Sequence, residues 1–316
     1  MLKQIFTAGL VCALSGAAHG QSSFPVKIIP GAVPADRSPD GNTVIFEDSE
    51  GLIVVDTGRH FEHQAAIIAY SYERKKPISA IVNTHWHLDH SGGNQELRVL
   101  FPNAKLYTSN AVKGALEGFL MKELDRSRVM VADPKVSEYE KSKIRLGISA
   151  LEDRKDLVPD VPVAGDLKLG RLELHLAPFA ATAGDTWLYD PESRTVVAGD
   201  LIVAPVPFFD TACGAGWRMA LDKVSAQSFE RIVPGHGPSL TRVEFEEYKT
   251  AFGGLLDCAA TTASVTSCAD KWRKDAARFM ATDAERAYAD RAIAYYLTNI
   301  LRMPAKQAEL CGAQKG

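Results

Sequence analysis

The sequence predicts a layered α/β fold, with two strand-rich halves that are each covered by helices. Short β-rich runs separated by turn residues occur in both halves of the chain. Stretches with helical spacing of apolar residues separate these runs and dominate the last part of the chain. Because a sheet buries a face and a helix buries a stripe, this order of elements favours sheets packed against helices.

The first elements to follow from the pattern are a hairpin, a helix and a strand. Runs 43–46 and 52–55 flank the turn-like segment 48–51, which is typical of a β-hairpin. Apolar residues at helical spacing predict a helix over 63–74. The mostly apolar run 78–82 then predicts a strand that ends at Asn83-Thr84.

The remaining elements continue this alternation. A helical pattern begins at 92–94, and the charged segment 110–160 is mostly helical, with a possible place over the site. Strands are predicted at 167–176, 187–189, 195–198 and 231–233. Beyond Thr241 the chain is largely helical. Its last helix carries an apolar stripe that is more typical of core packing than of a partner-binding surface, made of Ile293, Tyr296, Leu297, Ile300 and Leu301.

Composition is that of an ordinary globular protein. Of 316 residues, 46% are hydrophobic and 24% are charged, which supports a buried core in one large α/β domain or two small ones. The net charge of −3 gives no electrostatic reason to expect nucleic acid or an anionic membrane as a partner.

Residues 1–20 have the order of a secretory signal. Lys3 precedes an apolar stretch over 5–14, and small residues follow to Gly20. The segment is too short to span a bilayer, so cleavage after Gly20 is favoured over a buried N-terminal element, and no later segment is apolar enough to cross a membrane. We therefore expect a periplasmic or secreted protein whose mature part is 21–316.

Export implies that the cysteines form disulfides. The mature part holds four, an even number in an oxidising compartment, and four cysteines allow three pairings. The short loop between Cys258 and Cys268 makes that pair plausible and leaves Cys213 to pair with Cys311. Metal-binding thiols are less favoured, because the sequence has no C-x-x-C spacing.

The strongest chemical signal is the run 85–90, His-Trp-His-Leu-Asp-His, directly after the predicted strand 78–82. Zinc in proteins takes imidazole nitrogens and carboxylate oxygens in a compact, roughly tetrahedral set. Four such side chains within six residues at a strand end, His85, His87, Asp89 and His90, predict a metal site.

This run, preceded by Val-Val-Asp-Thr-Gly at 54–58, resembles the metallo-β-lactamase superfamily. Val-Ala-Gly-Asp at 197–200 is similar to the family's strand that ends in a metal-bridging aspartate, and Val-Pro-Gly-His-Gly at 233–237 to its last histidine ligand. The resemblance implies an αββα four-layer sandwich with the metals at the edge between two sheets. It also implies a single domain over 21–316 with a helical C-terminal extension.

The resemblance implies two metal positions of unequal strength. One would use Asp89, His90 and His236, with Asp200 shared. The other would use His85, His87 and a third histidine, but the segment 181–185 has alanine at the expected place, Ala181. His175 lies roughly 20 Å away along an extended strand and is a poor substitute. We therefore expect Zn²⁺ as the cofactor, with one tight ion and at most a second, weak one.

Asp56 is expected to lie beside the metals without touching them. Its carboxylate could accept a hydrogen bond from a ligand histidine and so fix the ring. Alternatively, it could order the turn at Thr57-Gly58. Trp86 and Leu88 alternate with the ligands and should point away from them, into packing.

The resemblance implies an exported zinc-dependent hydrolase in which metal-activated hydroxide attacks an ester, amide or thioester of a small-molecule substrate. Asp89 is the expected catalytic residue. The alternative is a catalytically degraded relative that binds metal or ligand, because of Ala181. An iron-dependent sulfur dioxygenase is disfavoured, since that site would need the missing histidine. The segment 209–213, with Gly216-Trp217, also resembles exported metallohydrolases associated with quinoprotein systems.

Overall fold

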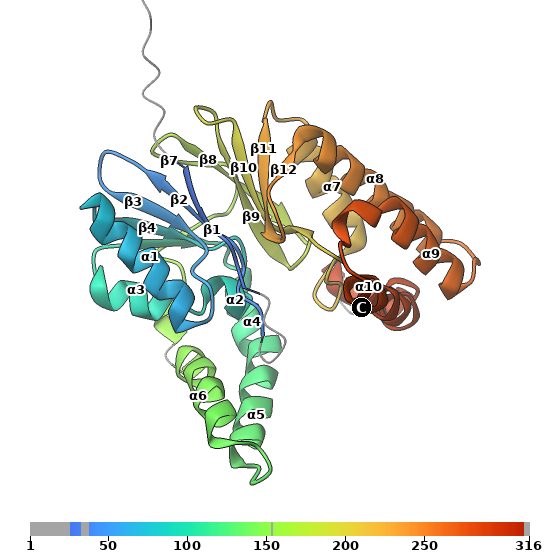
Figure 1. Ribbon diagram of the computed structural model, residues 1–316, viewed down its shortest axis with the longest axis horizontal. Helices are drawn as coiled ribbons and strands as arrows, with labels where there is room; N and C mark the ends of the chain where they lie inside the picture. The colour runs from blue at the N-terminus through green and yellow to red at the C-terminus, as the bar shows by residue number, and fades with distance from the viewer. Residues whose placement is uncertain (1–25, 33–37, 153, 313–316) are drawn as a thin grey trace, which may run out of the picture.

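Two six-stranded β-sheets lie between two layers of helices in the computed structural model, which describes residues 26–32, 38–152 and 154–312 (Figure 1). The predicted signal, 1–20, lies outside the described residues. No helix of the described part is both long and apolar enough to cross a membrane.

The first sheet combines an antiparallel edge with parallel strands. Its strands, in spatial order, are β1 (Val26–Ile29), β2 (Thr43–Glu47), β3 (Leu52–Val55), β4 (Ile78–Val82), β5 (Lys105–Thr108) and β6 (Val161–Pro162). The pairs from β1 to β3 are antiparallel, and those from β3 to β6 are parallel. Helices α1 (Phe61–Arg74) and α3 (Asn94–Leu100) cover the outer face (Figure 1).

The second sheet is antiparallel except at one pair. Its spatial order runs through β12 (Leu240–Thr241), β11 (Arg231–His236), β10 (Thr195–Val203), β9 (Gly184–Asp190), β8 (Leu172–Pro178) and β7 (Leu167–Leu169). Strands β10 and β11 are parallel, and irregularities in β10 at Gly199 break the regular register. This parallel pair places the ends of β10 and β11 on the same side of the sheet.

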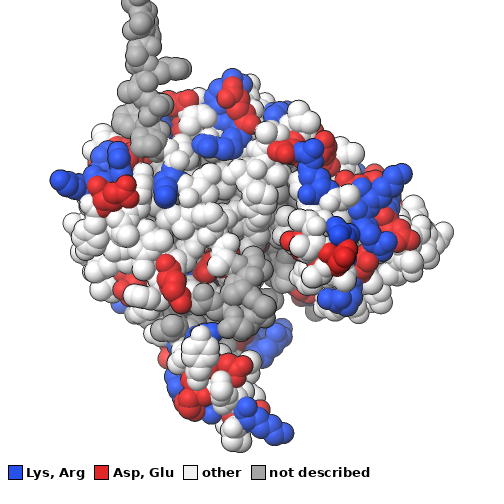
Figure 2. All heavy atoms as spheres, in the orientation of Figure 1, with Lys and Arg blue, Asp and Glu red and all other residues white. Residues whose placement is uncertain are grey.

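Helices fill the connections and the end of the chain. Helix α2 (Leu88–Ser91) comes between β4 and β5, and α4 (Ala111–Glu117), α5 (Phe119–Ala132), α6 (Glu138–Glu152) and η1 (Arg154–Asp156) come between β5 and β6. After β10 come α7 (Gly214–Ser225), α8 (Arg242–Ala259), α9 (Val265–Asp275), η2 (Ala277–Phe279), α10 (Asp283–Tyr296), η3 (Leu297–Leu301) and α11 (Pro304–Leu310). Helices α5 and α6 form a hairpin that projects away from the sheets, and α7, α8 and α9 lie beside the second sheet (Figure 1). On the face in Figure 2, acidic and basic side chains are interspersed over these outer helices.

The strands are apolar because both faces of each sheet are buried. On β2, Val44 and Phe46 contribute to the core between the two sheets, whereas Ile45 packs toward the helices. On β10, Val197 belongs to the inter-sheet core and Val196 to the core against α7 and α8. Such two-sided burial produces near-continuous apolar strands.

Several predictions about the fold are confirmed. The hairpin 43–55 and the strand 78–82 occur as expected. The C-terminal stripe packs in the core, with Ile293 and Leu297 fully buried. The disulfides are Cys258–Cys268 and Cys213–Cys311, as favoured.

Other elements differ from the prediction. Strand β10 continues to Val203, five residues beyond the predicted run, and carries Asp200 within it. Strand β5 and helix α7 were not predicted. The first turn of helix α7 contains two glycines, Gly214 and Gly216. Glycine is unfavourable in helices, so the sequence pattern did not predict a helix here.

Candidate metal centre

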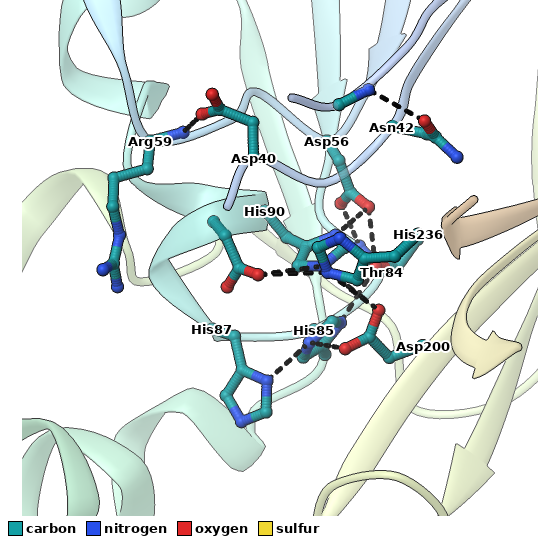
Figure 3. A network of polar contacts seen from close by, with 12 residues as sticks. Asp40, Asn42, Asp56, Arg59, Thr84, His85, His87, His90, Asp200 and His236 are labelled. Atoms are coloured by element: carbon teal, nitrogen blue, oxygen red, sulfur yellow. Dashed lines mark hydrogen bonds and ion pairs between the residues drawn. The ribbon is translucent and has the colours of Figure 1, made fainter. Parts of the chain in front are cut away.

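The histidines and carboxylates of the sequence motifs converge at the ends of strands from both sheets (Figure 3). His85 and His87 follow β4, and Asp89 lies with His90 in the short helix α2. Asp200 lies in the irregular second part of β10, and His236 is the last residue of β11. The parallel pairing of β10 and β11 therefore brings an aspartate and a histidine that are far apart in sequence to the same sheet end.

Asp89, His90 and His236 place three ligand atoms within 4.8 Å of one another. Nε2 of His236 lies 3.1 Å from Oδ2 of Asp89 and 3.2 Å from Nε2 of His90. Oδ1 of Asp200 lies 3.2 Å from Nε2 of His90 and 3.6 Å from Nε2 of His236. Ligand atoms placed tetrahedrally at zinc distances are roughly 3.4 Å apart, so these separations suit zinc.

His85 and His87 form a second group on the other side of Asp200. Nε2 of His85 lies 2.9 Å from Nδ1 of His87 and 3.5 Å from Oδ2 of Asp200. His85, His90 and Asp200 form another set of three ligand atoms within 4.8 Å of one another, and His87 belongs to neither set of three. Asp200 thus directs one oxygen toward each group.

The buried atoms of this cluster fit a cation. Nδ1 of His90 lies 2.8 Å from Oδ2 of Asp56, and a carboxylate needs a donor there, so the free lone pair of the ring is on Nε2. Oδ1 of Asp200 is buried, has no hydrogen-bond donor among the described residues, and faces that same nitrogen. Lone pairs that face one another away from water are unfavourable unless a cation lies among them. Nitrogen and carboxylate donors together suit zinc.

The electrostatics of the cluster also favour a cation. Burial lowers the pKa of His90, but Asp200, Asp56 and Asp89 outweigh it and raise that pKa well above its usual value. Burial raises the pKa of Asp89, but His90 and His236 hold it well below the usual range. The negative potential that attracts a proton to His90 also attracts a metal ion, which competes with that proton.

His85 is buried and His87 is partly buried, and both rings are neutral. Burial lowers the pKa of His85 well below its usual value and the pKa of His87 to about 4. Neutral imidazole is the form that binds metals. Both histidines can therefore act as metal ligands at neutral pH without first losing a proton.

Asp56 connects β3 to the cluster. It has φ of 61°, a left-handed conformation that aspartate adopts more readily than most residues. One oxygen accepts from the backbone N–H of Thr84 at 2.7 Å, and the other faces the Thr84 hydroxyl at 2.8 Å and Nδ1 of His90 at 2.8 Å. Asp56 therefore orients a ring of the cluster and the segment that precedes the motif. Within the described residues, its carboxylate contacts these groups rather than the turn at Thr57-Gly58.

Two glycines allow the close approach of the strands at this point. Gly199 has φ of +53°, and a Cβ there would lie 2.5 Å from the Cβ of Thr84. A Cβ at Gly235 would lie 2.0 Å from Oδ1 of Asp200. Glycine at both positions makes room for Asp200 to face the histidines.

Ala181 is buried beside the second group. Its turn is held by Asp185, which accepts from the backbone N–H and the hydroxyl of Thr182. The hydroxyl of Thr211 donates to the carbonyl oxygen of Ala181 at 2.9 Å and lies 3.3 Å from Nε2 of His87. A hydroxyl therefore lies between the alanine and the histidine.

Sequence reasoning missed Thr84 and Thr211 as residues of the site. Neither has a distinctive pattern, although Thr84 immediately precedes the His-rich motif. Trp86 and Leu88 pack away from the cluster against α4 and α5, as predicted. The three other described histidines have partners elsewhere: His60 with Asp40, His63 with Thr43, and His175 with Asp166.

A cavity of about 1150 Å³ opens onto the cluster. Its lining includes His87, Asp89, Asp200 and His236. The described residues of the α5–α6 hairpin that reach it, Phe119 and Glu123, lie in the first turns of α5, so most of the hairpin lies away from the site. A small molecule in this cavity would meet the candidate ligands directly.

Comparison with known proteins supports this architecture. The family model described as "Metallo-beta-lactamase superfamily" matches residues 39–236, more than half of the chain. A linear primary-alkylsulfatase from Pseudomonas sp. is 26% identical over 228 residues, covering 64% of this chain and 43% of the relative. An atrochrysone carboxyl ACP thioesterase from Aspergillus chevalieri is 27% identical over 124 residues, covering 38% of this chain and 36% of the relative. The chain spans less than half the length of these two curated relatives.

A solved structure shares the fold. The metallo-beta-lactamase FIM-1 from Pseudomonas aeruginosa, in its mono-zinc form, superposes with a TM-score of 0.51 at 21% identity, covering 72% of this chain and 90% of that chain. The predicted αββα sandwich is confirmed by this likeness and by the two sheets between helices. Fold, motif order and family match agree, and the chain belongs to the metallo-beta-lactamase superfamily.

Proposed function

We propose that this chain is a zinc-dependent hydrolase of small esters or thioesters. The observation that carries the proposal is the buried cluster in which Asp89, His90, His236 and Asp200 direct ligand atoms toward one another at 3.1–3.6 Å. These four residues would hold the tighter zinc. His85 and His87, with the second oxygen of Asp200, would hold a weaker ion, because Ala181 supplies no third imidazole.

Zinc at such a site supplies a water of lowered pKa and a Lewis acid for the substrate oxygen. The protein's own residues do the rest. Asp89 borders the cavity as an anion and can orient a water molecule there. Asp56 keeps Nε2 of His90 directed at the cluster, and the burial of His85 and His90 excludes competing water.

The known relatives favour hydrolysis over other reactions. The two curated relatives are by name an alkylsulfatase and a thioesterase, and both names denote hydrolysis of an ester-type bond. Carboxylic ester and thioester are the bonds we assign to this chain; an amide is a third possibility from the sequence motifs.

A non-catalytic relative that only binds metal or ligand is the second candidate. Ala181 favours it, because the second group lacks a donor. The open cavity beside Asp89, Asp200 and His236 favours catalysis, since a substrate in it can reach the candidate metal ligands. Metal content alone does not separate the two; turnover does.

We also propose that the protein is exported and acts outside the cytoplasm as a single domain over 21–316. The n-region, apolar stretch and small residues of 1–20 support a signal, and the two disulfides suit an oxidising compartment. Mass measurement of the exported chain should give a mature N-terminus near Gln21.

The test is metal removal and restoration. Purified mature protein should contain about one tightly held zinc, lose hydrolysis of aryl esters and thioesters after chelation, and regain it on addition of zinc. Zinc-loaded protein that hydrolyses neither class would contradict the proposal and support the binding-only alternative. Hydrolysis that persists after complete metal removal would overturn the assignment of the cluster.

A further inference from the structure

The cavity next to the cluster is formed only in part by the region that the family model matches. Its wall on the cluster side lies within 39–236, but Phe279, Ala284 and Tyr288 of η2 and α10 also line it. Side chains of the C-terminal helices, outside the matched region, therefore line the same cavity as the candidate metal ligands.

The lining away from the cluster is mainly apolar. Residues from the end of β10, the loop after it and the C-terminal helices present aliphatic and aromatic surface, including Ile202, Val206, Phe208, Phe279, Tyr288 and Tyr296. The ring centroids of Phe208 and Tyr296 lie 6.4 Å apart, which ties the loop after β10 to α10. An apolar pocket with a few polar groups at one end is the usual form of a site for an apolar ligand.

Outside the cluster, the charged residues of the described lining already have protein partners. Arg59 lies 3.1 Å from Glu123, and both line the cavity. Arg278 pairs with Glu244, another lining residue. A charged group on the ligand would have to displace one of these partners, so the wall favours an uncharged chain.

Glu285, also in the lining, is held at the start of α10. Its carboxylate accepts from the backbone N–H of Thr282 at 2.8 Å and from the Thr282 hydroxyl at 3.1 Å. This capping arrangement occupies Glu285 with its own helix. It leaves Ala284, Tyr288 and Tyr296 as the surface that α10 presents to the cavity.

We propose that the substrate is a carboxylic ester with an uncharged, apolar acyl chain, and that this chain binds in the cavity against the wall formed by η2 and α10. The inference rests on the proposed hydrolase function and names its substrate class. In the reaction, the acyl C–O bond breaks, the water oxygen bonds to the acyl carbon, and a water proton passes to the leaving alcohol. The acyl product leaves as a carboxylic acid.

The first test is a chain-length series of p-nitrophenyl esters on the zinc-loaded protein: acetate, butyrate, octanoate and dodecanoate. Each methylene that enters an apolar site contributes up to about fourfold. We expect kcat/KM to rise by roughly tenfold or more from acetate to octanoate. Equal or falling values along the series, with acetate hydrolysed, would refute the inference while leaving the hydrolase proposal intact.

Two tryptophan variants on α10 provide a matched pair. Ala284 and Ala287 are both exposed, but only Ala284 of the two is among the described cavity-lining residues. Ala284→Trp should fill the part of the cavity next to α10 and lower kcat/KM for the octanoate ester about tenfold. The value of kcat/KM for the acetate ester should be nearly unchanged. Ala287→Trp should leave both esters unchanged. Equal loss on both esters in Ala284→Trp, or equal effects of the two variants, would overturn the assignment of the wall.

A binding measurement separates this inference from catalysis. The uncharged fluorescent probe N-phenyl-1-naphthylamine should bind the metal-free protein and be displaced by methyl dodecanoate. Ala284→Trp should weaken probe binding about tenfold and Ala287→Trp should not. If neither esters nor thioesters are hydrolysed but the probe binds as expected, the hydrolase proposal fails and the apolar binding cavity stands. If the probe does not bind, or if Ala284→Trp does not weaken its binding, the inference about the cavity is refuted.

Discussion

The hydroxyl of Thr211 lies 3.3 Å from Nε2 of His87 and donates its proton to the carbonyl oxygen of Ala181. A hydroxyl has one proton, so at His87 the hydroxyl oxygen must accept, and Nε2 must carry the ring proton. The lone pair of His87 is then on Nδ1, the atom 2.9 Å from Nε2 of His85. Thr211 thus positions a candidate metal ligand.

Replacing Thr211 with valine should leave the imidazole ring of His87 without a fixed orientation. Valine keeps the shape but lacks the acceptor, so His87 loses the group that fixes its tautomer. Loss of such a partner typically weakens metal affinity about 10- to 100-fold, and we expect that loss at the weaker zinc position. Zinc titration calorimetry measures it, and ¹⁵N spectra of the metal-free protein report the tautomer. Thr211→Ser should behave as the parent; identical behaviour of valine and serine variants would remove Thr211 from the site.

Replacing Ala181 with histidine should strengthen the second position. Ala181 is buried, and the hydroxyl of Thr211 contacts both its carbonyl oxygen and His87. An imidazole at this position would complete a set of three histidines. Zinc content after dialysis should rise from about one to about two per chain. Overpacking a buried site costs about 1–3 kcal/mol, so the variant should melt at lower temperature without metal. Ala181→Leu controls for bulk and should gain no zinc. Two equally tight zincs in the parent would show that another group already supplies the ligand.

Replacing Asp89 with asparagine should remove hydrolysis while the fold persists. The change deletes the anion that borders the cavity and faces His236. We expect kcat/KM to fall roughly a hundredfold or more, because the anion that orients the attacking water is lost. Circular dichroism and zinc analysis check fold and metal content. Unchanged turnover with zinc in place would mean that Asp89 has no catalytic role.

Replacing Asp56 with asparagine should weaken zinc binding at the tighter position, although none of the candidate metal ligands is changed. The neutral amide is a poorer acceptor for Nδ1 of His90 and for Thr84, so ring orientation and basicity both suffer. Chelator competition should show zinc affinity lowered about 10- to 100-fold. Asp166→Asn, which alters the carboxylate paired with His175 elsewhere, should leave zinc affinity unchanged. Equal affinities for both variants would contradict the role of Asp56.

The two disulfides should contribute unequally to stability. Cys213–Cys311 joins residues 98 apart, and Cys258–Cys268 joins residues 10 apart. Loop-closure entropy in the unfolded chain makes the longer link more stabilising by roughly 2 kcal/mol. Replacing both cysteines of each pair with alanine, followed by urea unfolding of each variant, measures the difference. A larger loss in the free energy of unfolding for the Cys258–Cys268 pair would show that local packing, not chain entropy, determines how much each disulfide stabilises the fold.

The sequence was most informative where the chemistry is local. Four candidate ligands lie within the six residues of 85–90, and Asp200 and His236 end recognisable strand motifs. Their convergence follows from the parallel pairing of β10 with β11, which the motif order implied through the family resemblance.

Features that depend on tertiary packing were less accessible. Thr211 acts through two contacts with residues distant in sequence, and a single threonine in a loop gives no signal of that. The apolar wall of the cavity combines segments whose apolar residues look like ordinary core in the sequence. Strand β5 was missed because its four residues include Lys105, exposed at the start of the strand, and β-propensity over so short a run is weak.

His90 lies in α2, which follows β4 of the first sheet, and His236 lies 146 residues later in β11 of the second sheet. The first half of the chain alone holds His85, His87 and His90, but it lacks both Asp200 and His236. During synthesis from the N-terminus, a nascent chain therefore displays incomplete chelating groups until β11 has docked. On the proposed ligand set, high-affinity metal binding would follow the association of the two sheets, and the compartment in which folding finishes would decide which metal ion is bound.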